Sequence, residues 1–145
     1  MLDSDNDAEV QAAGIEEAKQ IQYFSILFQP VENKSVWQNC AKIIAAKSDS
    51  ELHEYILNMF EWLKDLNWPG SAIILERLKQ FPSSTIGYWL SYSIKKAVRE
   101  QDALWLMGLA CLCTDPKIYN QLNRKEKKIM RKSMKKINLR FENTN

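Results

Sequence analysis

The sequence predicts an all-α protein: one domain, residues 1–145, folded as a compact, HEAT-like stack of antiparallel helix pairs with about seven to eight helices. Two observations predict this class. Apolar residues recur at spacings of three and four along almost the whole chain, and no segment shows the alternation typical of a strand. Glycine and proline, four of each, are too scarce to punctuate a many-turned sheet.

The first helix is expected from about Asp7 to Phe28, where an apolar stripe follows acidic residues that complement the helix dipole. Pro30 ends it, because proline cannot continue the helical hydrogen bonding. The next helix is expected to begin at Ser35, which forms a capping-box pattern with Gln38 three residues later.

A third helix is expected over residues 48–66, which show the clearest apolar periodicity in the chain. Its start has a second capping-box pattern, Ser48 with Glu51. The fourth helix follows Pro69, because a proline loses nothing in the first turn of a helix, and Pro82 stops it.

The fifth helix starts near Ser83, and Asp102 caps the sixth. Asp115-Pro116 begins a short helical turn, and Asn123 caps a basic last helix over about 123–141. The third and fourth helices form one hairpin and the fifth and sixth another, with starts about 34 residues apart, a spacing typical of helical-pair repeats. The domain thus has an acidic helix at about 7–28, a HEAT-like core at about 30–122 and the basic helix at about 123–141. A plain irregular helix bundle is the alternative architecture.

The net charge of +2 conceals an uneven distribution. Nine of the 20 lysines and arginines lie within residues 124–140, where Glu126 is the one acid, whereas 16 of the 18 acids precede residue 124. The body of the domain is therefore acidic and its last helix strongly basic.

The start of the chain has neither a basic segment nor an apolar one, so a signal peptide is not expected. No stretch has the roughly 18 apolar residues of a membrane span, so no membrane association is expected and the protein is placed in the cytoplasm. The cysteines, Cys40, Cys111 and Cys113, do not form a disulfide pattern and are interpreted as small buried hydrophobes in a reducing compartment.

The segment from Phe60 to Ser71 resembles the signature of a small bacterial family, an uncharacterised all-helical domain marked by W-L-x-D-x-N-W-P. Trp62, Leu63, Asp65, Asn67, Trp68 and Pro69 match this signature directly. The resemblance covers about residues 30–115 and excludes the acidic start and the basic end. It implies a HEAT-like helical array and supplies no catalytic residues. By analogy, such domains resemble the immunity proteins encoded beside bacterial toxins, including those of contact-dependent inhibition systems.

No catalytic apparatus is evident, so the chain is not expected to be an enzyme. His53 is the only histidine and has no evident serine or cysteine partner, and no pair of cysteines has zinc-ligand spacing. No glycine-rich phosphate loop is present. We therefore expect no metal, no cofactor and no small-molecule ligand.

The pattern of residues in this signature is better explained by structure than by chemistry. Asp and Asn can cap neighbouring backbone, proline sets a helix start, glycine allows close approach, and the tryptophans would pack between hairpins. The residues interpreted in this way are Trp62, Asp65, Asn67, Trp68, Pro69 and Gly70.

A helical arrangement of residues 48–66 places an acidic stripe on one face, opposite the apolar one. Its members are Asp49, Glu51, Glu54, Asn58, Glu61 and Asp65. The stripe is either a solvated surface or a docking face for a basic partner. Since nucleases are basic in order to grip phosphate, the sharper hypothesis is an immunity protein that covers the active site of a toxin nuclease.

The basic last helix supports an alternative function, a nucleic-acid-binding module. The residues expected to contact phosphate are Lys125, Lys128, Arg131, Lys132 and Lys135. Against it, no aromatic residue lies among these cations until Phe141, so bases have little to stack on. The cations could instead be solvated, pair with the acidic start of the chain or bind a protein. A generic helical scaffold for protein–protein contact remains a further alternative.

Overall fold

The computed structural model describes residues 1–142, and the side chains of residues 1–138. These residues form α-helices joined by turns and three short 3-10 helices, and no strand occurs among them. The α-helices are α1 (Ala8–Ala18), α2 (Trp37–Ala45), α3 (Asp49–Leu52), α4 (Ile56–Trp62), α5 (Ser71–Lys79), α6 (Ser83–Arg99), α7 (Ala103–Leu112), α8 (Pro116–Tyr119) and α9 (Arg124–Glu142). The 3-10 helices are η1 (Ser25–Leu27), η2 (Lys34–Val36) and η3 (His53–Tyr55). The predicted all-α class is confirmed.

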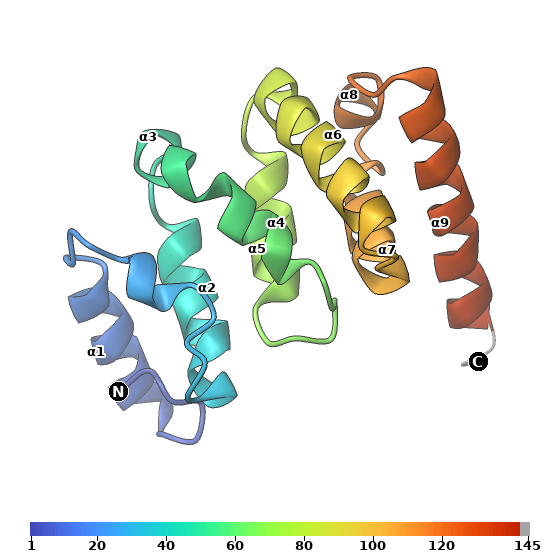
Figure 1. Ribbon diagram of the computed structural model, residues 1–145. Coiled ribbons are helices and arrows are strands. Elements are labelled where there is room, and N and C mark those ends of the chain that lie inside the picture. Colours follow the sequence, from blue (N-terminus) through green and yellow to red (C-terminus); the bar gives the residue numbers. More distant parts are fainter. Residues whose placement is uncertain (143–145) are drawn as a thin grey trace.

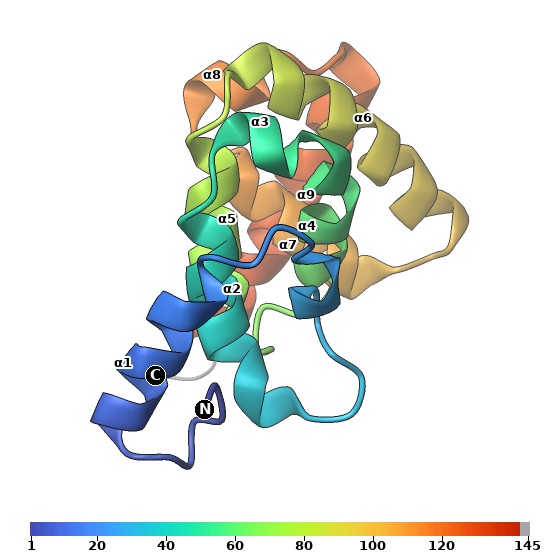
Figure 2. The same cartoon turned by 90° about the vertical axis from the view of Figure 1, so that its left-hand side faces the viewer.

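The helices are stacked in chain order in two layers, from α1 at one end of the molecule to α9 at the other (Figure 1). One layer contains α2, α5, α7 and α9, each packed against the next, while α4, α6 and α8 pack in the same order in the second layer. Figure 2 gives the view at right angles, with α1 projecting beyond the stack. The predicted helix pairs are present, and α3 and α6 start at Asp49 and Ser83, 34 residues apart.

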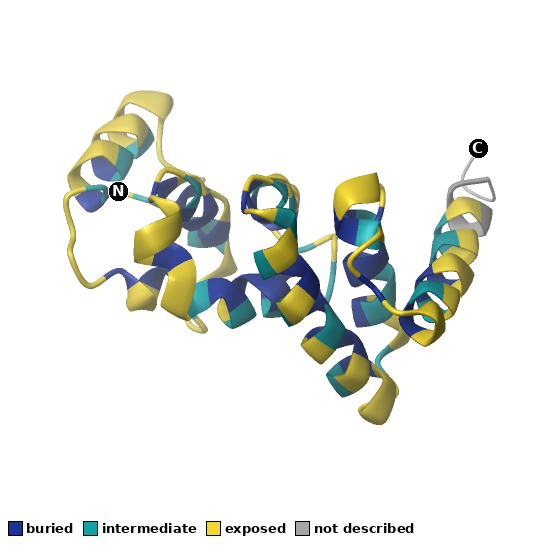
Figure 3. Ribbon diagram, turned by 90° about the horizontal axis from the view of Figure 1, so that it is seen from above, coloured by how far each residue is buried: buried dark blue, intermediate teal, exposed yellow. Residues whose placement is uncertain are grey.

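The core lies between the two layers, and Figure 3 shows that the buried residues follow the helix faces turned toward their neighbours. Trp62 and Trp105 are the largest fully buried side chains. The indole N–H of Trp105 donates a hydrogen bond to the Phe60 carbonyl oxygen at 2.9 Å, which joins α7 to α4. Each large apolar side chain buried here contributes about 1.5–3 kcal/mol relative to exposure.

The predicted helix from Asp7 to Phe28 is wrong beyond α1, which ends at Ala18. The chain turns away because the buried Lys47 ammonium donates hydrogen bonds to the Lys19 carbonyl at 2.8 Å and the Ile21 carbonyl at 3.3 Å. Cations stabilise helix C-termini in this way. The turn lets Phe24 pack against Tyr55 of η3, with ring centroids 5.1 Å apart. Tertiary packing therefore overrides the apolar stripe.

The predicted continuous helix over residues 48–66 is also wrong, because η3 separates α3 from α4 and α4 ends at Trp62. The capping box at its start is confirmed: the Ser48 side chain accepts from the Glu51 N–H, and the Glu51 carboxylate accepts from the Ser48 N–H. The break lies where Tyr55 stacks on Phe28 at 5.1 Å between centroids. Its effect is that the residues on either side share no single 3.6-residue face.

Two predicted helix starts differ in detail. Asn33, not Ser35, caps η2, and α2 then begins at Trp37 without a side-chain cap. The Gln38 side chain is not part of a capping box but accepts from the Gly70 N–H at 2.7 Å. Helix α5 begins at Ser71, two residues after Pro69, so the proline precedes the helix.

The caps predicted for the second half of the chain are confirmed. Asp102 caps α7, and Asp115 caps α8, whose first residue is Pro116. Asn123 accepts from the Glu126 N–H at 2.9 Å at the start of α9. Ile129, Met130, Met134 and Ile137 pack inward, as the apolar stripe predicted. None of the helices in the described part of the chain combines the length and the apolar character that a bilayer span requires.

Candidate functional site

The segment from Trp62 to Gly70 makes hydrogen bonds and close contacts within the fold. The indole N–H of Trp62 donates to the Pro69 carbonyl at 3.0 Å, and the Asp65 carboxylate accepts from the Asn67 N–H at 2.8 Å. Gly70 has φ of 86°, and a Cβ there would lie 2.6 Å from the Cβ of Ala41 and 3.0 Å from the Trp37 carbonyl oxygen. Only glycine fits this conformation and this approach without strain.

Trp62 and Trp68 both contact Trp37 of α2, with ring centroids 6.0 and 5.6 Å apart in edge-to-face geometry. The expectation was packing between the two predicted hairpins, but the ring that both tryptophans contact lies on α2, which belongs to neither hairpin. The signature joins α4, α2 and α5, and the Trp62 indole and the Asp65 carboxylate are hydrogen-bonded to the backbone of the same segment.

The acidic residues predicted for a docking face lie on the outer edge of α3, η3 and α4, but several already have partners. Asp49 accepts from the Arg77 guanidinium at 2.6 Å, and this arginine, only 5% exposed, also donates to the Lys47 carbonyl at 2.9 Å. Glu61 accepts from Lys96 of α6 at 3.1 Å and lies 3.9 Å from Lys64. These cations cancel much of the negative charge that the sequence suggested.

Two pKa values reflect these contacts. The Ser48 backbone N–H, together with the Ser48 hydroxyl, lowers the pKa of Glu51 below its ordinary value of 4.5. The hydrogen bond from Lys96 to Glu61 raises the pKa of that lysine above 10.5.

Glu54 and Asn58 are exposed, and among the described side chains neither has a hydrogen-bonding or ionic partner. Within the predicted face, only Glu54 and Asn58 are therefore without partners among the described side chains. The neighbouring carboxylates of Asp49, Glu51 and Glu61 are bound by Arg77, Ser48 and Lys96.

The cations of α9 remain on the surface. All five residues of the predicted basic face, Lys125, Lys128, Arg131, Lys132 and Lys135, are exposed, as are Arg124 and Lys136. No salt bridge to these residues occurs within the described side chains. Glu126 is only 4% exposed and is occupied by the Asn123 N–H at 3.0 Å and by the Ser91 hydroxyl of α6. Helix α9 thus presents an unneutralised positive surface at the end of the stack.

The possible pairing of this helix with the acidic start of the chain is wrong. The first residues and α1 pack on α2, at the end of the molecule opposite α9 (Figure 1). The two charged segments are therefore separated by the whole stack.

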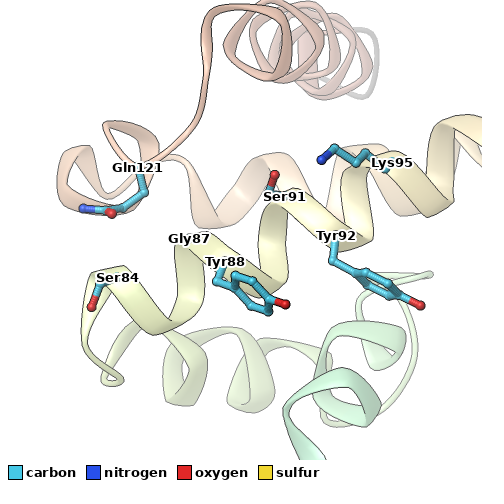
Figure 4. A pocket seen from close by; sticks show the side chains of 7 residues that line it. All are labelled: Ser84, Gly87, Tyr88, Ser91, Tyr92, Lys95 and Gln121. Carbon is cyan, nitrogen blue, oxygen red and sulfur yellow. The ribbon is translucent and has the colours of Figure 1, made fainter.

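A surface that sequence reasoning missed lies on α6, beside α8 and α9. Ser84, Tyr88, Ser91, Tyr92 and Lys95 line a hollow of about 420 Å³ with Gly87 and with Gln121 from the turn after α8 (Figure 4). Tyr88 is 69% and Tyr92 47% exposed. In Figure 4 their rings and the side chains of Ser91 and Lys95 project from different sides of α6.

A second hollow, of about 230 Å³, adjoins the first because Lys95 lines both. Its apolar floor is formed by Ile94, Val98 and Ile129, and its rim includes Arg99 of α6 and Lys125 of α9. The periodicity of α6 could have revealed its outer face, since Tyr88, Tyr92, Lys95 and Arg99 recur at helical spacing. The proximity of that face to α9 could not be inferred from the sequence.

The structure offers little for catalysis in its described part. No group of three or more histidine, cysteine, aspartate or glutamate residues there could hold a metal ion. His53 is exposed on η3, and although Ser50 and Thr85 line the same shallow hollow, no hydrogen bond joins either to it. Burial raises the pKa of Cys40 to about 11 and that of Cys113 to about 12, so both thiols stay protonated.

Residues 33–144 match the family described as Domain of unknown function (DUF5071). The chain belongs to the DUF5071 family. No curated protein and no solved structure matches it. The match begins at Asn33 and therefore leaves α1 and η1 outside the DUF5071 domain, in agreement with the expected exclusion of the acidic start. The expected limit near residue 115 is wrong, because the family domain includes α8 and the basic α9.

Proposed function

We propose that this DUF5071 protein is a non-catalytic binding protein of the immunity type, which neutralises a bacterial toxin in the cytoplasm by covering its active site. The supporting observation is the ordered acidic edge of α3, η3 and α4. Asp49 is fixed by Arg77 and Glu51 by Ser48, yet both side chains remain 48% exposed. Carboxylates that are already ordered lose little side-chain entropy when a partner binds.

The partner that fits this edge is a basic protein surface, such as the phosphate-binding groove of a nuclease. Glu54 of η3 and Asn58 of α4 are both exposed, and Glu54 is a carboxylate without an ionic partner among the described side chains. Because Arg77, Lys64 and Lys96 neutralise the flanks, electrostatic steering would be weaker than six free carboxylates would produce. Affinity would then depend on shape and on a few direct ion pairs.

The test is toxin binding and toxin protection by a variant with Glu54→Lys and Asn58→Lys. Asp49, Glu51 and Asp65 are left unchanged, because they hold the fold and their reversal would confuse misfolding with lost binding. The matched control is Glu17→Lys with Gln20→Lys, the same chemical changes at exposed positions near the end of α1.

The proposal predicts that a toxin domain is encoded next to this gene, and that domain is the probe. Titration calorimetry should show at least about tenfold weaker binding for the α3–α4 edge variant and unchanged binding for the control, since close charge pairs contribute at least about 1.5 kcal/mol. Co-expressed cells should lose protection in parallel. Equal binding by both variants would remove the acidic edge from the mechanism, and absence of binding by the unaltered protein would remove the toxin.

A second function, nucleic-acid binding through α9, is favoured by a separate observation. The exposed cations of this helix have no acidic partner among the described side chains, whereas Asp49 and Glu61 of the α3–α4 edge are paired with cations. A polyanion would relieve the repulsion among neighbouring lysines one turn apart. Such binding should weaken steeply as the salt concentration rises.

A further inference from the structure

The exposed part of α6 has aromatic and cationic residues at helical spacing. Tyr88, Tyr92, Lys95 and Arg99 are all exposed and recur at spacings of three and four, and the two tyrosine rings and the Lys95 side chain leave the helix toward different sides (Figure 4). Trp89, which is half-buried, contacts both tyrosines edge to face, with centroids 4.9 Å from Tyr88 and 6.2 Å from Tyr92. Both tyrosines are therefore supported by Trp89, while Tyr88 is 69% and Tyr92 47% exposed to solvent.

The two hollows connect this row to α9. Lys95 lines both hollows, and Arg99 and Lys125 line the second from opposite sides. Along α9, Lys132 and Lys136 follow Lys125 on the same side of the helix, at spacings of seven and four. The acids nearby are Glu126, which is buried and hydrogen-bonded, and Glu100 at the end of α6. The surface is strongly positive along its length.

We propose that this surface, the outer face of α6 with the adjoining side of α9, binds single-stranded nucleic acid. The phosphates lie along Lys95, Arg99, Lys125 and Lys132, and unstacked bases cover the rings of Tyr88 and Tyr92. The inference rests on the second proposed function and names its ligand and site. It supplies the aromatic platform that α9 alone lacks.

Charge and exposed rings together select this ligand. The bases of a duplex are stacked on one another, so the phosphates of a duplex could bind the cations but its bases could not stack on the tyrosine rings. An acidic protein segment would likewise use the cations and gain little from two exposed rings. A single strand uses both, because every base has a face that can stack on an aromatic side chain.

The experiment measures binding of the full chain to fluorescent oligomers of about 20 nucleotides. The probes are a thymidine strand, a uridine strand, a DNA duplex of equal length and a glutamate polymer of similar charge. Affinity is measured over a series of salt concentrations. Four phosphate contacts predict a slope of log affinity against log salt of about −3 for a single strand.

Two pairs of variants separate the contributions of stacking and charge. Replacing both tyrosines, Tyr88→Ala and Tyr92→Ala, should reduce affinity for the single strands by about 30-fold or more with the salt slope unchanged. The tyrosine-to-phenylalanine pair should bind normally. Lys95→Gln with Lys125→Gln should make the slope shallower by about 1.4. The controls at the other end of the molecule, Tyr23→Ala and Lys34→Gln with Lys42→Gln, should change nothing.

The outcomes distinguish this inference from the function on which it rests. No binding of any nucleic acid at low salt would refute the second proposed function and this site together. Equal binding of strand and duplex, insensitive to the tyrosines, would refute the single-strand site and leave binding by α9 standing. A glutamate polymer that binds as tightly as the strands, with the same dependence on the tyrosines, would overturn the assignment in favour of an acidic protein.

Discussion

Gly108 in α7 is the position where a single methyl group should disturb the stack most. A Cβ built there would lie 1.9 Å from the Leu63 carbonyl oxygen and 3.2 Å from the Leu63 Cβ. Leu63 follows the last turn of α4 and is fully buried, so it has no free space into which to move. The substitution Gly108→Ala therefore tests how tightly the two layers are held together.

The magnitude follows from two opposing effects. Ordinary contact begins near 3.4 Å, so α7 would have to withdraw from α4 by about 1.5 Å. Overpacking of this kind costs about 1–3 kcal/mol, and more where the neighbour is rigid backbone. Alanine in place of glycine recovers about 1 kcal/mol of helix propensity. Because the withdrawal would also loosen Trp105 on Phe60, we expect a net loss of about 2 kcal/mol.

Urea unfolding followed by circular dichroism measures this loss. With a slope of about 2 kcal/mol per molar, the midpoint should fall by about 1 M. The control is Gly14→Ala in α1, where the new Cβ would meet Met1, a residue that is 57% exposed and belongs to no helix. That variant should be as stable as the unaltered protein or more so. Unchanged or increased stability of Gly108→Ala would refute the close contact of α7 with α4.

The remaining predictions concern the thiols and one carboxylate. Iodoacetamide at pH 8 should modify the native protein first at the half-buried Cys111. Burial raises the pKa of Cys40 to about 11 and that of Cys113 to about 12, so these two thiols should react only after unfolding in urea. Mass spectrometry measures the order of modification, and rapid labelling of Cys113 would contradict its burial. The pKa of Glu51 is lower in the folded protein than its ordinary value of about 4.5, so the ionised carboxylate stabilises the fold at pH values above 4.5. This stabilisation is lost as the pH falls through the pKa that Glu51 has in the folded protein. The unaltered protein should accordingly have a larger free energy of unfolding than the Glu51→Gln variant at pH 7, and the difference should vanish in acid. A difference that does not change with pH would show that the charge of Glu51 is not its cause.

The parts of the fold that were predictable from sequence are those whose causes are local. Asp102, Asp115 and Asn123 cap helices that start within a residue or two of them, so composition and spacing are sufficient. The apolar stripe of α9 was recognisable for the same reason. The class of the fold followed from many such local signals agreeing with one another.

The failures have non-local causes. Helix α1 ends early because Lys47, 28 residues away from Lys19, binds the Lys19 and Ile21 carbonyl groups that follow the helix. The 3-10 helix η3 interrupts the third predicted helix where Tyr55 packs against Phe24 and Phe28. The acidic stripe was drawn on an uninterrupted helix and could not include its counter-ions. Arg77 lies 28 residues from Asp49 along the chain, and Lys96 lies 35 residues from Glu61.

The two parts of the proposed nucleic-acid surface, on α9 and on α6, also differ in how far they could be predicted from the sequence. The cations of α9 were evident from sequence because they are consecutive, but their aromatic neighbours are on α6. Tyr88 and Tyr92 precede α9 by more than 30 residues, and the short α8, packed against α6, brings the two segments together. Gly87 makes this possible, since a Cβ there would overlap the Gln121 side chain at 2.4 Å. A site assembled by such packing has no signature in the local pattern of either helix.

The position of α9 at the end of the stack explains its polarity but not the sign of its charge. A terminal helix in a layered array has one face without a neighbour, and a polar outer face there keeps the array soluble. Alternating acidic and basic residues would also make the outer face polar, and they would form stabilising ion pairs one helical turn apart. The helix instead presents Arg124, Lys128, Arg131 and Lys135 in succession, an arrangement that opposes its own stability. The fold does not require this uniform positive charge, which matches the charge of a polyanion.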